Sequence, residues 1–276
     1  MFLWATRLAC AFMALGAAAN VHAQEPARPQ LALMGTVPIY WGEADGLAGM
    51  LDTTATGHWA RPVLEREFEL VPLDYLSAEA LAPHRVLMLA QPRALSAEEN
   101  VALDGWVRGG GRLLLFADPM MTGHSHYGLG DRRRPQDVAL LSPILAHWGL
   151  DLLFDAEQPG GLRQIEGDGW SLPVNLAGQM QARDGGTCLF EAGGLLARCR
   201  LGEGEALVVA DAALLDLEMP HMDSAKGLQD LLAAIIGKSG EIAGEPTSIP
   251  QSEPANSGVG AVLGHANRTP PSSQAP

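Results

Sequence analysis

Lysine is almost missing from this sequence, which contains only Lys226 and Lys238. Arginine supplies nearly all of the positive charge, and 18 basic residues stand against 32 acidic ones, for a net charge of −14. A protein that binds nucleic acid needs a basic face to neutralise phosphates. The shortage of positive charge therefore excludes nucleic acid as an expected partner.

Several motifs that identify common enzyme classes are also missing. The sequence has no G-x-S-x-G elbow, the turn that exposes the nucleophilic serine of α/β-hydrolases. It has no Walker A loop, and no G-x-G-x-x-G follows its first apolar segment, so nothing indicates nucleotide binding. No two carboxylates stand out from their spacing as an acid–base couple. The sequence therefore predicts no cofactor and no catalytic residue.

Long apolar runs are scarce, and the one at residues 8–19 has a particular setting. It follows Arg7 and precedes Val21-His22-Ala23, where small residues stand three and one positions before Gln24. This pattern predicts a cleavable signal peptide over residues 1–23 and a periplasmic location. The run is too short for a spanning helix, which needs about 20 apolar residues. Because no second such run follows, we expect that the cleaved protein does not span the membrane.

The other end of the sequence also differs from a folded core. Residues 239–276 are rich in Pro, Ser, Gly and Ala and show no apolar period. Such a segment cannot bury enough apolar surface to offset its conformational entropy, so it is predicted to be a disordered tail. Residues 30–238 remain, and their length suits one domain.

Cysteine is rare, and only Cys188 and Cys199 lie within the expected domain. Gly193-Gly194 lies between them and is a strong signal for a two-residue hairpin turn. Each cysteine is five residues from the turn glycine on its side, so the two face each other across the expected hairpin. Directly opposed strand residues are close enough for a disulfide, and an exported protein meets an oxidising compartment. We expect a disulfide here; the alternative is a pair of reduced, half-buried thiols.

Apolar segments and helical patterns alternate along the first part of the domain. Residues 85–89, 112–117 and 152–154 are continuous apolar runs without alternation, as in strands that are covered on both faces. Between the first two, Ser96 and Glu99 form a capping box at the start of an amphipathic helix. This alternation predicts a mostly parallel sheet with helices on both faces, whereas the short strands after residue 170 predict a C-terminal antiparallel hairpin extension.

The segment QPRALSAEENVALDGWVRGGGRLLLFADP, residues 91–119, resembles the periplasmic auxiliary domain of gliding-motility-type ABC transport systems. The strand at 85–89 and the later segment ALVVADAALL at 206–215 are similar to the same family, and the resemblance covers about residues 31–236. It implies a flavodoxin- or amidotransferase-like α/β fold. It also implies a non-catalytic, extracytoplasmic binding module that is accessory to a transport or envelope complex.

The same resemblance directs attention to the turn at Ala90-Gln91-Pro92. In amidotransferase-like enzymes the nucleophile stands on the sharp turn after a central strand, and this turn has neither Cys nor Ser. Because a thiol mechanism needs its thiol and histidine within hydrogen-bond reach, amidotransfer is not expected. The resemblance therefore predicts that the chain is not an enzyme, with Gln91 as a ligand- or partner-binding residue.

The segment after Asp118 is the most unusual part of the domain. His124 and His126 form an H-x-H pair with Asp118 and Asp131 near them in sequence. Imidazole and carboxylate groups suit zinc or copper, but residues two apart need not converge, and two solvated histidines explain the pattern equally well. An envelope hydrolase or metal-dependent enzyme that uses residues 118–134 is the alternative function.

Arg132, Arg133 and Arg134 form the only basic cluster of this acidic sequence. Arginine grips carboxylates and phosphates well, so the cluster is a candidate ligand or partner site. The opposing interpretation is that these arginines pair with acids of the chain itself, such as Asp131 and Asp137.

Trp41 and Glu43 lie in a glycine-containing segment that follows the first expected strand. We expect this segment to reach the same sheet edge as Asp118 and to add an aromatic surface for a ligand or partner.

Overall fold

The computed structural model describes residues 27–43, 57–216 and 223–237. The predicted signal peptide and the predicted tail lie outside these residues. Across the described residues, helices are too short or too polar to cross a membrane.

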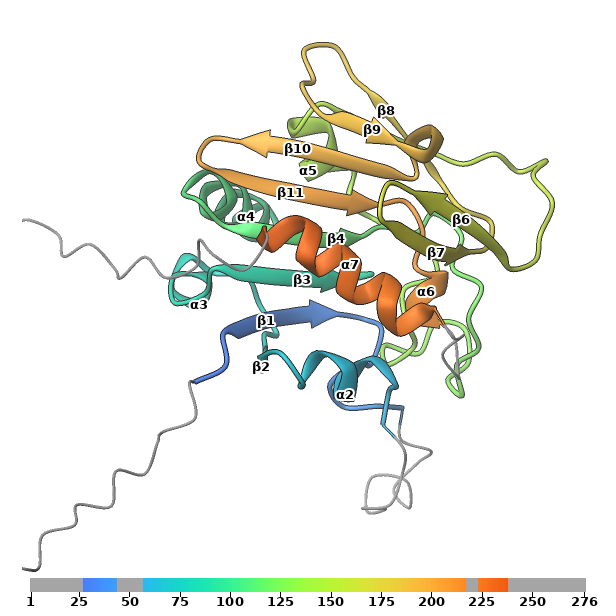
Figure 1. Ribbon diagram of the computed structural model, residues 1–276, viewed down its shortest axis with the longest axis horizontal. Helices are drawn as coiled ribbons and strands as arrows, with labels where there is room; N and C mark the ends of the chain where they lie inside the picture. The colour runs from blue at the N-terminus through green and yellow to red at the C-terminus, as the bar shows by residue number, and fades with distance from the viewer. Residues whose placement is uncertain (1–26, 44–56, 217–222, 238–276) are drawn as a thin grey trace, which may run out of the picture. The chain divides into compact units, whose positions relative to one another are not determined.

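A seven-stranded sheet with the order β2-β1-β3-β4-β11-β10-β9 forms the centre of the fold (Figure 1). Its first five strands in this order run parallel, and β10 and β9 continue it in antiparallel orientation. The strands are β1 (Gln30–Gly35), β2 (Glu69–Pro72), β3 (Val86–Ala90), β4 (Arg112–Phe116), β9 (Leu189–Glu191), β10 (Leu196–Leu201) and β11 (Gly204–Val209). The predicted α/β fold with a largely parallel central sheet and an antiparallel extension is confirmed.

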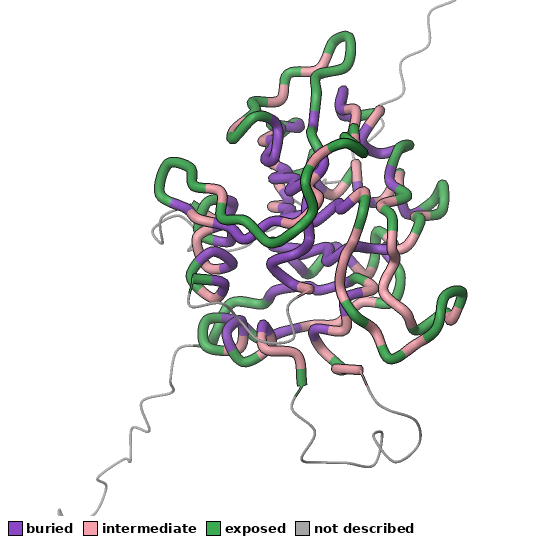
Figure 2. Tube along the Cα trace, turned by 90° about the vertical axis from the view of Figure 1, so that its right-hand side faces the viewer, coloured by how far each residue is buried: buried purple, intermediate pink, exposed green. Residues whose placement is uncertain are grey.

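Helices cover both faces of this sheet, because the central strands carry apolar side chains on both faces. Alternate residues of β1 show this: Leu31 and Leu33 belong to one apolar cluster, and Ala32 and Met34 to the other. Figure 2 shows the buried interior and the exposed connections around it. The helices are α2 (Ala60–Leu64), α3 (Ala78–Leu81), α4 (Ala97–Arg108), α5 (Ser142–His147), α6 (Ala213–Asp216) and α7 (Ser224–Ile236).

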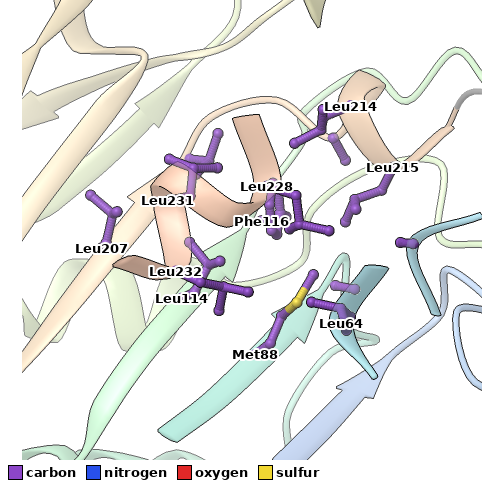
Figure 3. Packing of buried hydrophobic residues seen from close by; sticks show 14 of the residues in the cluster. Leu64, Met88, Leu114, Phe116, Leu207, Leu214, Leu215, Leu228, Leu231 and Leu232 are labelled. Atoms are coloured by element: carbon purple, nitrogen blue, oxygen red, sulfur yellow. The ribbon is translucent and has the colours of Figure 1, made fainter. Parts of the chain in front are cut away.

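On one face, α7 places Leu228, Leu231 and Leu232 over apolar side chains of the sheet that include Leu114 and Phe116 (Figure 3). The three leucines follow helical spacing, so one stripe of α7 is apolar. Each contributes roughly 1.5–3 kcal/mol by burial. On the other face, α3, α4 and α5 supply buried residues of the second cluster.

The predicted capping box is present at the start of α4. The Ser96 hydroxyl accepts from the Glu99 amide at 3.1 Å, and the Glu99 carboxylate accepts from the Ser96 amide at 2.9 Å. Burial by itself would raise the pKa of Glu99, but hydrogen bonds from Arg93 and from the amides of Ser96 and Leu76 outweigh it and lower this pKa to about 2. The box thus also anchors α4 to the preceding segments.

The strand expected at residues 152–154 lies outside the central sheet. β5 (Leu150–Leu153) pairs with β8 (Gln179–Ala182) in a separate two-stranded sheet, because β11 occupies the place beside β4. A second small sheet joins β6 (Arg163–Gly167) to β7 (Trp170–Val174).

The structure contains the predicted disulfide between Cys188 and Cys199, with Cα atoms 4.2 Å apart. β9 and β10 pair in the expected register, in which Arg198 faces Leu189. Between them lies the short 3₁₀ turn η1 (Ala192–Gly194), and Gly193 and Gly194 both have positive φ, as a tight hairpin requires. The disulfide closes a short loop and contributes on the order of 2–3 kcal/mol.

Candidate functional site

Two buried aspartates follow neighbouring strands at the same edge of the sheet. β4 and β11 run parallel with Phe116 opposite Val209, and Asp118 and Asp211 each come two residues after this pair. The carboxyl ends of parallel strands in open α/β sheets are where such folds bind ligands. The register of β4 and β11 therefore brings the two carboxyl groups to one place.

Both aspartates bind backbone amides where the strands end. Asp118 accepts from the amides of Met120 at 2.8 Å and Ala212 at 2.9 Å. Asp211 accepts from the amides of Ala213 at 2.7 Å and Asn175 at 3.0 Å. Asp118 thereby joins the end of β4 to the residue that precedes α6, while both side chains are almost fully buried.

Asp216 is the last residue of α6, and its side chain adds a third carboxyl group beside the other two. It accepts hydrogen bonds from the hydroxyl and amide of Thr122 and from the amide of Gly123. A Cβ at position 123 would lie 1.4 Å from Asp216 Oδ1, so only glycine leaves room for this carboxyl group. Asp216 is partly exposed to solvent, whereas Asp118 and Asp211 are buried. We use the name acid cluster for Asp118, Asp211 and Asp216.

Burial raises the pKa of every member of the acid cluster, and the charge of Asp118 adds to this effect at Asp211 and Asp216. Burial raises the pKa of Asp118 to about 6. Burial, followed by the charge of Asp118, raises the pKa of Asp216 to about 6 and that of Asp211 well above its ordinary value. These carboxyl groups keep protons that an exposed aspartate releases near pH 3.9. A partly exposed carboxyl group with such a pKa can give and take protons close to neutral pH.

His58 holds α6 from the other side. Its Nε2 lies 2.7 Å from the carbonyl oxygen of Leu215, and its Nδ1 accepts from the Ala60 amide at 3.1 Å. Nε2 therefore carries the proton in the neutral ring. Burial lowers the pKa of His58 and favours this neutral form. The histidine thus fixes the residue directly before Asp216.

The arginine cluster is paired largely with acids of the chain itself. Arg133 binds Asp131 through two nitrogens, at 3.1 and 2.7 Å, and lies over the ring of Tyr127. Arg134 binds Asp137, at 2.9 Å from Nη2. Only Arg132 has no ion pair among the residues described. The prediction that this cluster grips a ligand therefore applies to Arg132 alone.

The two loop histidines do not form part of a metal cage. His124 and His126 are exposed, and the His126 amide donates to the Glu43 carboxylate at 3.0 Å. Within the three described stretches, no three histidine, cysteine or acidic side chains are grouped as metal ligands would be. Glu43 thus anchors the backbone of the loop that carries His126. Trp41 is 77% exposed, and the centre of its ring lies 4.7 Å from that of Tyr40.

Gln91, predicted as a binding residue, is fully buried instead. Its side-chain nitrogen donates to the carbonyls of Asp118 at 2.9 Å and Gln136 at 3.0 Å, and its oxygen accepts from the Asp118 amide at 2.8 Å. With both ends of the amide used, Gln91 joins the turn after β3 to the turn after β4. It supports the site, and no ligand reaches it in this arrangement.

A surface groove of about 430 Å³ opens beside the acid cluster. Its walls include Val174, Ala177 and Gly178, and the Gly178 amide donates to the Ala210 carbonyl at 2.7 Å, next to Asp211. Asn175 follows the wall residue Val174 and contacts the cluster, because its amide donates to Asp211 at 3.0 Å and its side chain donates to Thr122 at 3.0 Å. The groove and Asp216 are thus separated by a few hydrogen-bonded residues.

Sequence reasoning identified Asp118 but missed Asp211, Asp216 and His58. Asp211 had a usable signal, since it follows an apolar run just as Asp118 does. Asp216 and His58 had none, because their roles depend on contacts with residues far away in the sequence.

No family model matches this sequence, and no curated protein matches it. Solved structures do match. The GH42 β-galactosidase Gan42B from G. stearothermophilus is 15% identical, with a TM-score of 0.45 over 77% of this chain and 30% of that one. The exo-β-1,4-mannosidase Op5Man5 from Opitutaceae bacterium strain TAV5 is 15% identical, with a TM-score of 0.40 over 67% of this chain and 31% of its own.

A cytoplasmic protein from Salmonella typhimurium is 12% identical, with a TM-score of 0.41 over 75% of this chain and 98% of its own. The chain thus spans about a third of the length of the glycosidases it matches. The resemblance to the auxiliary domain of ABC transport systems is corrected, because no family model matches the sequence and the solved structures reported above are not described as such domains. The comparisons therefore do not support the predictions of an amidotransferase-like, non-catalytic transport accessory and of a chain that is not an enzyme.

Proposed function

We propose that this protein is a hydrolase and that Asp216 is its general acid–base residue. The observation that carries the proposal is the position of Asp216: it is partly exposed at the carboxyl edge of the sheet, and its pKa is raised to about 6. General acids work best when their pKa lies near the working pH. Asp118 and Asp211 support this role, since burial and the charge of Asp118 keep protons on the cluster.

The type of bond that is broken follows from the groups present at the site. These groups are carboxylic acids, and the sequence has no G-x-S-x-G serine elbow that would supply a nucleophile instead. Glycoside hydrolysis suits such a site, because protonation of the bridging oxygen by a carboxylic acid breaks the C–O bond. In this scheme Asp216 gives its proton to that oxygen, and the leaving sugar or alcohol departs neutral. Water then adds to the sugar carbon, and its proton restores Asp216.

The strand order supports a ligand site at this edge. The sequence β2-β1-β3-β4-β11 among the parallel strands is the order of flavodoxin-like doubly wound sheets, and we infer that arrangement here. In these sheets ligands bind beyond the carboxyl ends of the strands, which is where the acid cluster and the groove lie.

We also propose that the protein works outside the cytoplasm, in the periplasm. Two features support this: the signal-like pattern of residues 1–23 and the Cys188–Cys199 disulfide, a bond that is rare in reducing compartments.

Aryl glycosides provide the direct test of the hydrolase proposal. Purified protein is incubated with a panel of p-nitrophenyl α- and β-glycosides from about pH 4 to about pH 9, and release of p-nitrophenol is measured. We expect turnover of at least one glycoside, with kcat/KM falling about tenfold per pH unit above about pH 6, because only protonated Asp216 donates. The proposal is refuted if no member of the panel is hydrolysed at any pH.

A further inference from the structure

The groove beside the acid cluster contains two opposite charges that do not neutralise each other. Arg163 and Asp155 both line it, and no carboxylate–guanidinium contact within 4.0 Å joins them. Neither side chain has another ion-pair partner within the described part of the chain. Arg112 and Arg198, by contrast, each bind a carboxylate.

Each of the two charges is held in place by neutral groups. The Arg163 guanidinium donates to the Gln158 side-chain oxygen at 3.1 Å and to the Pro159 carbonyl at 3.5 Å. Gln158 is itself fixed, because its nitrogen donates to the Ala177 carbonyl at 2.9 Å. One oxygen of Asp155 accepts from the Glu157 amide at 2.9 Å, and the other oxygen is uncommitted among these contacts.

Apolar side chains also line the groove. Its wall includes Phe154, Ile165, Val174 and Leu195. A ligand that fits must therefore present an anionic group, a cationic group and an apolar body between or beside them. The volume of the groove, about 430 Å³, is in the range of small-molecule sites.

We propose that this groove binds a short zwitterionic peptide, with its terminal carboxylate on Arg163, its terminal ammonium on Asp155 and its apolar side chains against Phe154 and Ile165. A dipeptide extends over about 7 Å and holds its two terminal charges apart, so each can meet one of two side chains that do not contact each other. Guanidinium groups bind carboxylates in a fork geometry, which gives the Arg163 end its selectivity.

Isothermal titration calorimetry with leucyl-leucine tests this binding without reference to hydrolysis. The free dipeptide is compared with its N-acetyl form and with its C-terminal amide. We expect the free dipeptide to bind, and each blocked form to bind about tenfold or more weakly, because each block removes one charge pair. The Asp216→Asn variant should bind the free dipeptide as the wild type does, so a failure of the hydrolase proposal leaves this result unaffected.

Variants of the two charged residues identify which end of the ligand each one recognises. Arg163→Gln should bind the dipeptide and its amide equally, and Asp155→Asn should bind the dipeptide and its N-acetyl form equally. Arg200→Gln is the matched control, since Arg200 is an exposed arginine on β10 outside the groove, and it should retain both preferences. Absence of binding, or equal binding of free and blocked dipeptides by the wild type, would overturn the proposal.

Discussion

Replacing Asp216 with asparagine is expected to lower kcat/KM for a hydrolysed aryl glycoside by about 10²–10⁴-fold, the usual contribution of a general acid. Asparagine has nearly the same shape and can still accept from Thr122 and Gly123, so α6 should keep its place. It has no proton to donate to a leaving oxygen. The loss should therefore appear in kcat, whereas KM changes little.

The control for this substitution is Asp168→Asn, which removes an exposed carboxylate from the turn between β6 and β7. Its activity should equal that of the wild type. Circular dichroism and thermal unfolding show whether both variants are folded. A folded Asp216→Asn variant with wild-type kcat would rule out Asp216 as the proton donor.

Replacing Asp118 with alanine is expected to lower the free energy of unfolding by about 2–3 kcal/mol, the cost of leaving one buried and one part-buried amide without acceptors. Those amides belong to Met120 and Ala212, and the side chain that satisfies them is fully buried. The substitution also removes the repulsion that Asp118 exerts on Asp211 and Asp216, which offsets part of this loss.

Urea unfolding at neutral pH measures this loss, with Asp151→Ala as the control because Asp151 is half-exposed and forms only a 3.7 Å ion pair with Arg183. The control should change the free energy of unfolding by less than about 0.5 kcal/mol. Asp118→Asn should fall between the two, since an amide oxygen can replace one of the two acceptors. An Asp118→Ala variant as stable as the control would show that Asp118 does not hold the strand ends together.

Features that depend on local pattern were predictable from the sequence. The continuous apolar runs at β3 and β4 predict buried parallel strands, and Ser96 with Glu99 predicts the start of α4. The Gly193-Gly194 turn fixes the register of β9 and β10, and that register determines the disulfide. In each case the physical cause lies within a few residues, so the sequence alone contains the information.

Features that depend on distant contacts were not predictable. Arg133 and Arg134 were ambiguous until the loop placed Asp131 and Asp137 against them. The sequence predicts Gln91 as a ligand- or partner-binding residue, because nothing in its neighbourhood indicates that its side chain binds Gln136 and Asp118. The position of Asp216 depends on hydrogen bonds from Thr122 and Gly123, which lie more than 90 residues earlier in the sequence.

The functional interpretation failed for a related reason. The segments that suggested a transport accessory are a buried strand, a capped helix and a glycine turn, which specify a fold rather than a chemistry. The groups to which we assign chemistry lie where those elements end, and their protonation depends on burial that the sequence does not display.

Site-specific titration of the Asp216 carboxyl carbon by ¹³C NMR tests the central claim most directly. Spectra of aspartate-labelled wild-type protein are recorded across the pH range, with the Asp216 signal assigned from its absence in the Asp216→Asn variant. A pKa of about 6 is predicted, because burial and the charge of Asp118 favour the protonated form. A pKa near 3.9, that of a solvated aspartate, would contradict the assignment of Asp216 as a proton donor near neutral pH.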